Sequence, residues 1–199
     1  MGVNNHPGRK AILMLSKINT LLLGLIAQKP LNPYEIQHIL NKSHIRSWFP
    51  IAESSVYAGI RVLHEKGYIQ GEGRKENNMP EKTIYCLTEK GSEALKNAVE
   101  QYLSCRDLDP VAFHTGILFM HQLDRDLARA IFNQKLKSMD EETFLLKKQL
   151  DESPKSYIAE TMLKHRIYLI FSEAKTIREL LEKVEKDLLW NAHPIMDAE

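Results

Sequence analysis

The sequence predicts a mainly α-helical chain with one small β-hairpin, divided into two parts. Apolar residues recur at helical spacing over most of the 199 residues, whereas strand-like alternation is confined to residues 68–70 and 82–87. Residues 1–91 hold 12 Lys and Arg against 7 Asp and Glu, and residues 92–199 hold 15 against 19. Because one part is basic and the other acidic, we expect the two parts to have different tasks.

Three short helices are expected after a flexible N-terminal arm at residues 1–14. Each helix has one apolar face and starts beside a residue that can cap it. The start of the second helix is the most specific, because Asn32, Pro33 and Glu35 have the types and spacing of a capping box with proline in the first turn. The three helices are predicted at about residues 17–27, 33–42 and 54–66.

A β-hairpin at residues 68–87 and a fourth helix at about 89–104 complete the first part. Gly, Asn and Pro residues separate the two predicted strands, and Thr88 can cap the helix that follows. Three short helices followed by a hairpin are typical of a winged helix-turn-helix. We therefore predict such a domain over residues 15–105, with the hairpin as its wing.

Residues 106–192 are expected to form a helical dimerisation domain that could also bind an effector, followed by a tail at 193–199. Asp109 and Asp124 can cap two of its helices, and Ser153-Pro154 separates the second helix from the third. The first helix is predicted from Pro110 to about Gln122 and the second from Arg125 to about Leu150. The third is predicted after Ser153-Pro154 and runs to about Trp190.

The last predicted helix carries apolar residues at alternating spacings of four and three, which is typical of a coiled-coil seam. The seam could pair with the preceding helix of the same chain. Further apolar residues beside it make the stripe wide enough for two neighbours, so we predict a homodimer. The seam residues are Leu163, Ile167, Ile170, Ala174, Ile177, Leu181, Val184 and Leu188.

The first part resembles the PadR family of bacterial regulators over about residues 15–91. Four groups of residues carry the resemblance: Leu22-Leu23-Gly24-Leu25; Pro30-Leu31 with Tyr34-Glu35-Ile36; Ser54-Ser55-Val56-Tyr57 with Leu63 and Gly67-Tyr68-Ile69; and Pro80, Lys82, Tyr85, Leu87, Thr88 and Gly91. The sequence departs from the family pattern at Pro33, at Ala58 and in the wing, where Asn78, Met79 and Glu81 replace part of the basic charge. The second part resembles, in length and architecture, the longer-tailed members related to virulence activators.

This resemblance implies a sequence-specific DNA-binding transcriptional regulator, a repressor by family habit. Such a protein binds a palindromic operator on double-stranded DNA as a homodimer, and a small-molecule effector can release it. The alternative is a protein-interaction module that uses the winged-helix surface without binding DNA.

The third helix has an aromatic and basic face that suits the major groove, and the wing carries further cations. Tyr57 could instead pack against the second helix, and Arg61 could be a solvated charge or could contact either a base or a phosphate. Tyr34 is included because of the family resemblance. The expected DNA contacts are Tyr34, Ser54, Ser55, Tyr57, Arg61, Arg74, Lys75 and Lys82.

The short helix after Pro110 offers Phe113, His114 and Phe119. These side chains could line an effector pocket between the two domains or form the core that joins them, and the core is favoured because aromatic residues at helical spacing usually pack.

Other classes of protein are not supported by the sequence. Cys86 and Cys105 are too few for a disulfide framework, and the eight His residues do not cluster at the spacing of metal ligands. There is neither a phosphate-binding glycine loop nor a nucleophile–base pattern, so we expect no metal, no cofactor and no enzymatic activity. Without a signal peptide or a membrane-spanning run, we expect a cytoplasmic location and no membrane contact.

Overall fold

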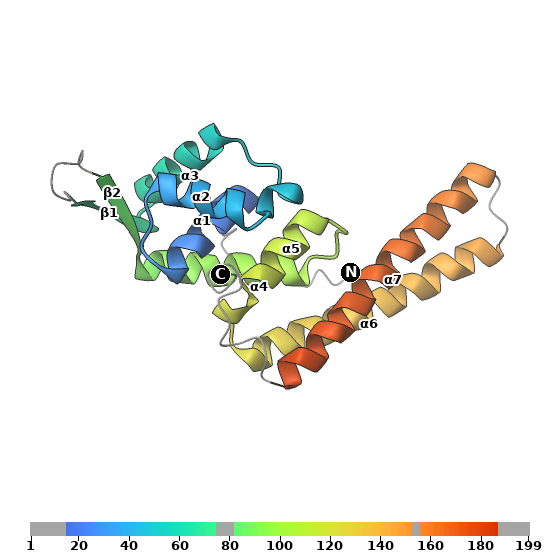
Figure 1. Ribbon diagram of the computed structural model, residues 1–199. Coiled ribbons are helices and arrows are strands. Elements are labelled where there is room, and N and C mark those ends of the chain that lie inside the picture. The colour runs from blue at the N-terminus through green and yellow to red at the C-terminus, as the bar shows by residue number, and fades with distance from the viewer. Residues whose placement is uncertain (1–14, 75–81, 153–155, 187–199) are drawn as a thin grey trace, which may run out of the picture.

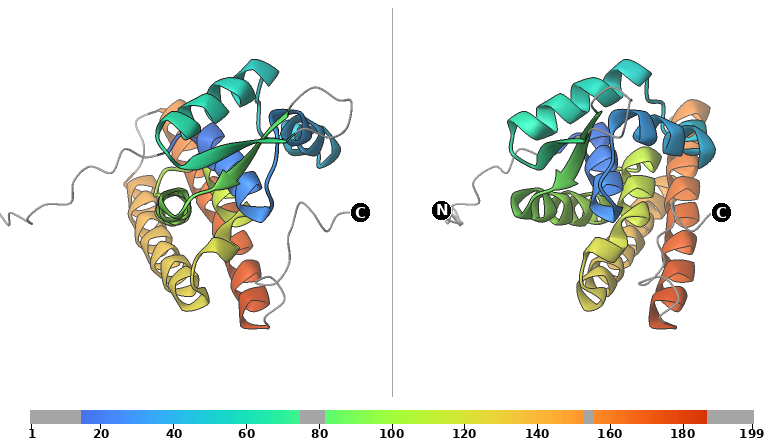
Figure 2. Two further views of the ribbon diagram at one scale, coloured as in Figure 1. Left: turned by 90° about the vertical axis from the view of Figure 1, so that its left-hand side faces the viewer. Right: turned by 60° about the vertical axis from the view of Figure 1, so that its left-hand side comes forward.

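The computed structural model describes residues 15–74, 82–152 and 156–186. These residues form seven α-helices, two short 3-10 helices and a two-stranded antiparallel hairpin, which confirms the mainly helical fold class. Figure 1 shows a rounded body and a long two-helix arm that meet at an elbow, with the two strands at the end of the body away from the arm, and Figure 2 turns that end toward the viewer.

The body contains four α-helices, one 3-10 helix and the hairpin. Their bounds lie within a few residues of the predicted ones, and the 3-10 helix lies in a segment that was predicted to be a loop. The elements are α1 (Lys17–Gln28), α2 (Pro33–Lys42), η1 (Ile45–Ser47), α3 (Glu53–Glu65), β1 (Ile69–Arg74), β2 (Lys82–Leu87) and α4 (Glu89–Ser104).

The elbow and the arm contain three α-helices and a second 3-10 helix. The helix predicted to reach Gln122 ends at Leu118, because the chain tightens at Phe119 into a 3-10 turn. The last helix ends at Glu185 rather than near Trp190, and residues 187–199, including Leu188, lie outside the described part of the chain. The elements are α5 (Pro110–Leu118), η2 (Met120–Gln122), α6 (Arg125–Asp151) and α7 (Tyr157–Glu185).

Helix α1 is the centre of the body, and residues 20–26 are all buried. Helices α3, α4 and α5 pack around it, which is possible because small residues let the backbones approach closely. A Cβ atom on Gly59 of α3 would lie 2.5 Å from Cδ1 of Leu22, and one on Gly24 would lie 2.5 Å from the ring of Phe119. Helix α1 therefore contacts both the helix predicted to bind DNA and the segment that leads to the arm.

The base of the wing is fixed to the body. Strands β1 and β2 pair from Ile69 opposite Leu87 to Arg74 opposite Lys82. The hydroxyl of Thr88 accepts from the backbone N–H of Gly91, which caps α4, and donates to the carbonyl of Gly67 at the end of α3. The wing therefore starts from a set position relative to α3.

In the arm, the predicted seam of α7 faces α6 of the same chain. Ile170, Ala174, Ile177 and Val184 are buried, and Leu163, Ile167 and Leu181 are half-buried. The pairing within the chain that the sequence left as an alternative therefore occupies most of this seam. Apolar residues of α6, such as Phe132 and Met139, are buried in the same cluster as the seam, and α6 packs against α7.

In the residues that the structure describes, no helix combines the length and the apolar character needed to cross a membrane. Within the same residues, no three or more His, Cys, Asp or Glu side chains gather where they could hold a metal ion.

Candidate nucleic-acid interface

Helix α3 presents one face to the core and the opposite face to solvent. Val56, Ile60 and Leu63 are buried, at spacings that follow the helical repeat. On the outward face Ser54 is exposed, and Tyr57 keeps 55% of its surface accessible rather than packing into the body. Ser55 is half-buried at the edge of this face. The outward face of α3 is therefore accessible to a partner as large as a DNA duplex.

Arg61 lies in the middle of the outward face, with 76% of its side chain exposed. Its Nε is 3.9 Å from Oε1 of Glu65, one turn further along α3. An exposed pair at this distance contributes little stability and breaks easily, so the guanidinium is free to turn toward a phosphate or a base.

Tyr34 extends from the first turn of α2 and is 74% exposed. The predicted capping box is present, since the backbone N–H of Asn32 donates to Oε2 of Glu35 at 2.8 Å and the N–H of Glu35 donates to Oδ1 of Asn32 at 3.0 Å. Pro33 occupies the first helical position. The cap fixes the backbone from which the Tyr34 hydroxyl extends, so this hydroxyl is available as a donor to a phosphate oxygen.

Two cationic residues of the wing lie directly opposite each other on its two strands. Arg74 and Lys82 are paired across the two strands, and the Lys82 side chain is exposed. Lys75 belongs to residues 75–81, which lie outside the described part of the chain, so its predicted contact is untested.

Some exposed residues on the outward face of α3, among them Ala58 and Glu65, are missing from the predicted set. Ala58 is exposed beside Tyr57, and Glu65 is exposed one turn after Arg61. Helical spacing from Ser54 and Arg61 places both on this face, but neither has the basic, hydroxyl or aromatic side chain that predicts a DNA contact. Ala58 adds only a methyl group to this face, and Glu65 adds a carboxylate beside the guanidinium of Arg61.

Of the three residues predicted for an effector pocket, two are buried in the core and one is exposed. Phe119 is fully buried against Gly24, and Phe113 is buried beneath the ammonium of Lys135, which lies 4.6 Å from its ring centroid. His114 is exposed, and its ring stands edge-on to Trp48 at 5.3 Å. The first two residues therefore form part of the core that joins the body to the arm.

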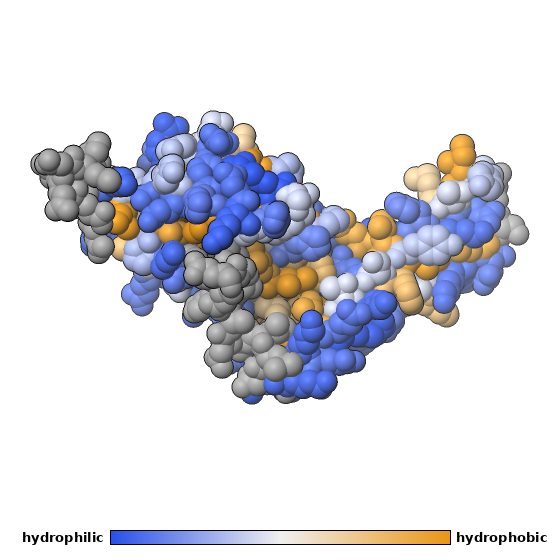
Figure 3. Space-filling model, viewed as in Figure 1, coloured by the Kyte–Doolittle hydropathy of each residue, from blue (hydrophilic) through white to orange (hydrophobic). Residues whose placement is uncertain are grey.

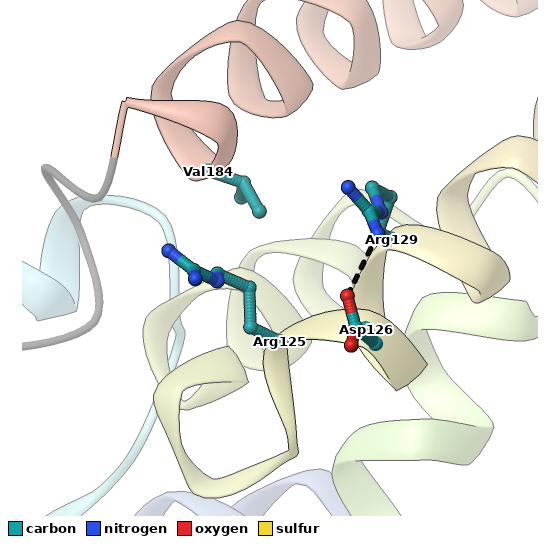
Figure 4. A pocket seen from close by; sticks show the side chains of 4 residues that line it. All are labelled: Arg125, Asp126, Arg129 and Val184. Atoms are coloured by element: carbon teal, nitrogen blue, oxygen red, sulfur yellow. Dashed lines mark hydrogen bonds and ion pairs between the residues drawn. The ribbon is translucent and has the colours of Figure 1, made fainter.

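Two cavities of about 280 Å³ each lie near the base of the arm. One is between the first turn of α6 and the end of α7, where Arg129 pairs with Asp126 at 2.7 Å and Val184 and Arg125 complete the lining (Figure 4). The other is between the end of α4 and α6. Its lining residues are Ser104, Arg106, Ala130, Ile131, Gln134, Lys135 and Ser138.

The surface of the molecule changes character from the body to the arm. Figure 3 shows a hydrophilic surface over α2 and α3, whereas apolar side chains gather at the elbow and at the tip of the arm. Large exposed apolar residues of the arm include Phe144 and Leu145 of α6 and Ile158, Met162 and Phe171 of α7.

Comparison with known proteins identifies the first part of the chain. Residues 22–97 match the family model described as "Transcriptional regulator PadR-like family". No curated protein matches the chain.

Solved structures similar to this chain include Bacillus subtilis PadR in complex with operator DNA, with 17% identity, coverage of 85% of this chain and 99% of that chain, and a TM-score of 0.42. A PadR-like transcriptional regulator from Bacillus cereus has 19% identity, the same coverage and a TM-score of 0.36. A protein from Streptococcus mutans has 23% identity, covers 83% of this chain and 98% of its own, and has a TM-score of 0.39.

The family match covers α2, α3 and the wing, and it agrees with the resemblance expected from residues 15–91. Residues 22–97 of this chain are therefore similar to the PadR-like family of transcriptional regulators.

Proposed function

We propose that the chain is a sequence-specific DNA-binding repressor that recognises a palindromic operator as a homodimer. The observation that carries this proposal is the outward face of α3, where Ser54, Tyr57 and Arg61 are exposed on a helix whose opposite face is buried. A helix held in this way can enter the major groove while the wing reaches the neighbouring backbone. The PadR-like family match over residues 22–97 supports the same function.

The proposed contacts divide into two kinds. Tyr34, Ser54, Ser55 and Lys82 suit phosphate oxygens, because they offer hydroxyl or ammonium donors at helix starts and on the wing. We assign Arg74, which ends β1, and Lys75, which follows it in the sequence, to the same group because both are cationic. We assign base reading to Arg61, whose guanidinium can donate two hydrogen bonds to a guanine edge.

Selection of bound sequences from random duplex DNA tests the proposal. A palindrome should be enriched, and Arg61→Ala should weaken binding to it by about 1–3 kcal/mol. Arg178→Ala is the matched control, because Arg178 is also an exposed arginine but lies on α7. Failure to enrich any palindrome would favour the alternative, a protein-interaction module that uses the same surface.

The homodimer is proposed on the arm. The seam from Leu163 to Val184 is mostly used within the chain, so we assign the partner contact to the exposed apolar residues beside it, chiefly Phe144, Ile158 and Met162. Exposed apolar residues concentrated in one region are typical of protein interfaces.

Light scattering at micromolar concentration tests this assignment. We expect a dimer for the wild type and a monomer for Ile158→Glu, with Lys147→Glu as an exposed control on the same arm. A monomeric wild type would contradict the homodimer, and a dimeric Ile158→Glu variant would contradict the proposed surface.

A small-molecule effector is the remaining part of the proposal. The cavity between α4 and α6 supports it, because Arg106 and Lys135 face a space next to Phe113, one of the residues predicted for an effector site. An effector seated there would act on the junction between the body and the arm. A thermal-shift screen of small carboxylates tests this, with Arg106→Ala expected to abolish any shift; a retained shift would move the site elsewhere.

A further inference from the structure

Helix α3 differs from the other described α-helices in how its first turn is held. In α1, α2, α4, α5, α6 and α7 the N-cap side chain accepts a hydrogen bond from the first turn. The N-cap of α3 is Ala52, which has no side chain able to do this. A missing cap costs a helix about 0.5–2 kcal/mol and leaves its first turn free to fray. The helix proposed to read DNA therefore needs another means of fixing its start.

Arg46 in η1 supplies contacts on both sides of the turn that leads to α3. Its Nε donates to Oδ1 of Asn41 at 2.6 Å, and its Nη2 donates to Oε1 of Gln37 at 2.5 Å, both on α2. Its Nη1 donates to the backbone carbonyl of Ile51, just before α3. The guanidinium is planar, so its three donors fix α2 and the segment before α3 in one geometry.

Gln37 extends this set of contacts to α3 itself. While its amide oxygen accepts from Arg46, its Nε2 donates to the backbone carbonyl of Glu53 at 3.1 Å. Glu53 is the first residue of α3. A continuous hydrogen-bonded path therefore runs from η1 through α2 to the first residue of the uncapped helix.

We propose that Arg46 is a positioning residue for DNA recognition, acting through Gln37 and Ile51 to set the register and angle of α3 on α2. This inference rests on the proposed function for its effect on DNA binding, but not for its effect on the start of α3. Tyr34 on α2 and Arg61 on α3 can engage one DNA duplex together only if the two helices keep a constant relation. Arg46 is the residue that holds this relation.

The test compares two variants. Arg46→Lys keeps the positive charge but loses the planar guanidinium with its three donors. Gln37→Leu removes the hydrogen bonds of Gln37 to Arg46 and Glu53 without changing any charge. Hydrogen exchange of the full-length protein is measured first, at a temperature where every variant is folded. Both variants should speed exchange by about tenfold at residues 57–60, the amides of α3 that follow its uncapped first turn and have intrahelical acceptors, with no change in α1 or α4. Unchanged exchange at α3 would overturn the proposal whether or not the protein binds DNA.

DNA affinity is measured next, on the selected operator and on an unrelated duplex, over a range of salt concentrations. Both variants should weaken operator binding by about tenfold while leaving non-specific binding within about twofold and the salt slope unchanged. If Arg46 contacted a phosphate instead, Arg46→Lys would retain affinity and Arg46→Gln would lower the salt slope by about one. That result would overturn the positioning role, and so would unchanged operator affinity in Gln37→Leu.

Discussion

At the scale of single residues, Gly24 shows how the packing of the core depends on the close approach of two groups. Gly24 has no side chain where the ring of Phe119 packs against α1, and Phe119 is fully buried there. Gly24→Ala would drive a methyl group into the ring, so we expect a loss of about 1–3 kcal/mol in the free energy of unfolding. Urea denaturation measures this loss.

The same substitution in a Phe119→Leu background is the matched control for Gly24→Ala, because the smaller side chain leaves room for a methyl group. There the added loss should fall below about 1 kcal/mol. An equal loss in both backgrounds would show that the ring is not the cause.

Asp109 is a second residue whose local chemistry can be measured. Its carboxylate accepts from the ammonium of Lys17 at 2.5 Å, and this bond holds the pKa of Asp109 below its ordinary value of 3.8. A carboxyl with a lower pKa in the folded chain stabilises the fold above its unfolded pKa, and this contribution is lost as the pH falls through the folded value. The contribution is therefore fully present at neutral pH, begins to shrink below about pH 4 and is lost only when the pH falls through the folded pKa.

Asp109→Asn isolates this effect, because Asn can still cap α5. The stability difference between the wild type and this variant should be constant from neutral pH to about pH 4 and then shrink on further acidification. Urea midpoints across this range provide the measurement, and a difference that does not depend on pH would contradict the role of the ion pair.

At the level of elements, the pairing of α6 with α7 includes a buried ion pair. Nζ of Lys135 is 2.7 Å from Oε1 of Glu173, and the side chains are only 3% and 11% exposed. Lys135→Met leaves a carboxylate buried without its partner, so we expect a loss of about 3–5 kcal/mol in the free energy of unfolding.

The double variant with Glu173→Leu tests whether that loss comes from the stranded charge. It should recover most of the stability, since two apolar side chains can replace a buried ion pair at little cost. Chemical denaturation of the four proteins in the cycle gives the coupling energy between the two sites. Additive losses would mean that the two charges do not depend on each other.

The elements also show what the sequence can and cannot predict. Local signals were sufficient for α2, whose capping box is formed by Asn32 and Glu35 as expected, and for β2, whose bounds agree. Local signals were insufficient where tertiary packing decides. Helix α5 ends at Leu118, next to Phe119, whose ring packs against Gly24, far away in the chain. The heptad spacing of α7 cannot say whether α6 or a second chain covers it.

The proposed DNA contacts follow the same division. Exposure of Tyr57 and Arg61 could be predicted from the helical period of the buried residues between them. The role of Arg46 could not, because its partners Gln37, Asn41 and Ile51 are brought together only when α2 and α3 pack.

At the scale of the whole molecule, two copies joined through their arms would hold two α3 helices at a set separation. Operator affinity should then depend on half-site spacing with the period of the DNA helix. Inserting about 5 base pairs between half-sites should remove most of the specific affinity, and inserting about 10 should restore part of it. Equal affinity for all spacings in a gel-shift titration would indicate that each copy binds alone.

Because the arm is long, a small rotation at the elbow produces a large displacement of the arm tip. Helix α6 has 27 residues, so it forms a rod of about 40 Å. A rotation of about 5° at the base of such a rod moves its tip by about 3.5 Å, close to the rise of one base pair. In the proposed homodimer, a small change in packing around Phe119 at the base of the arm would therefore change the separation of the two α3 helices by about one base-pair step, so that core packing at the elbow would set the operator length that the dimer recognises.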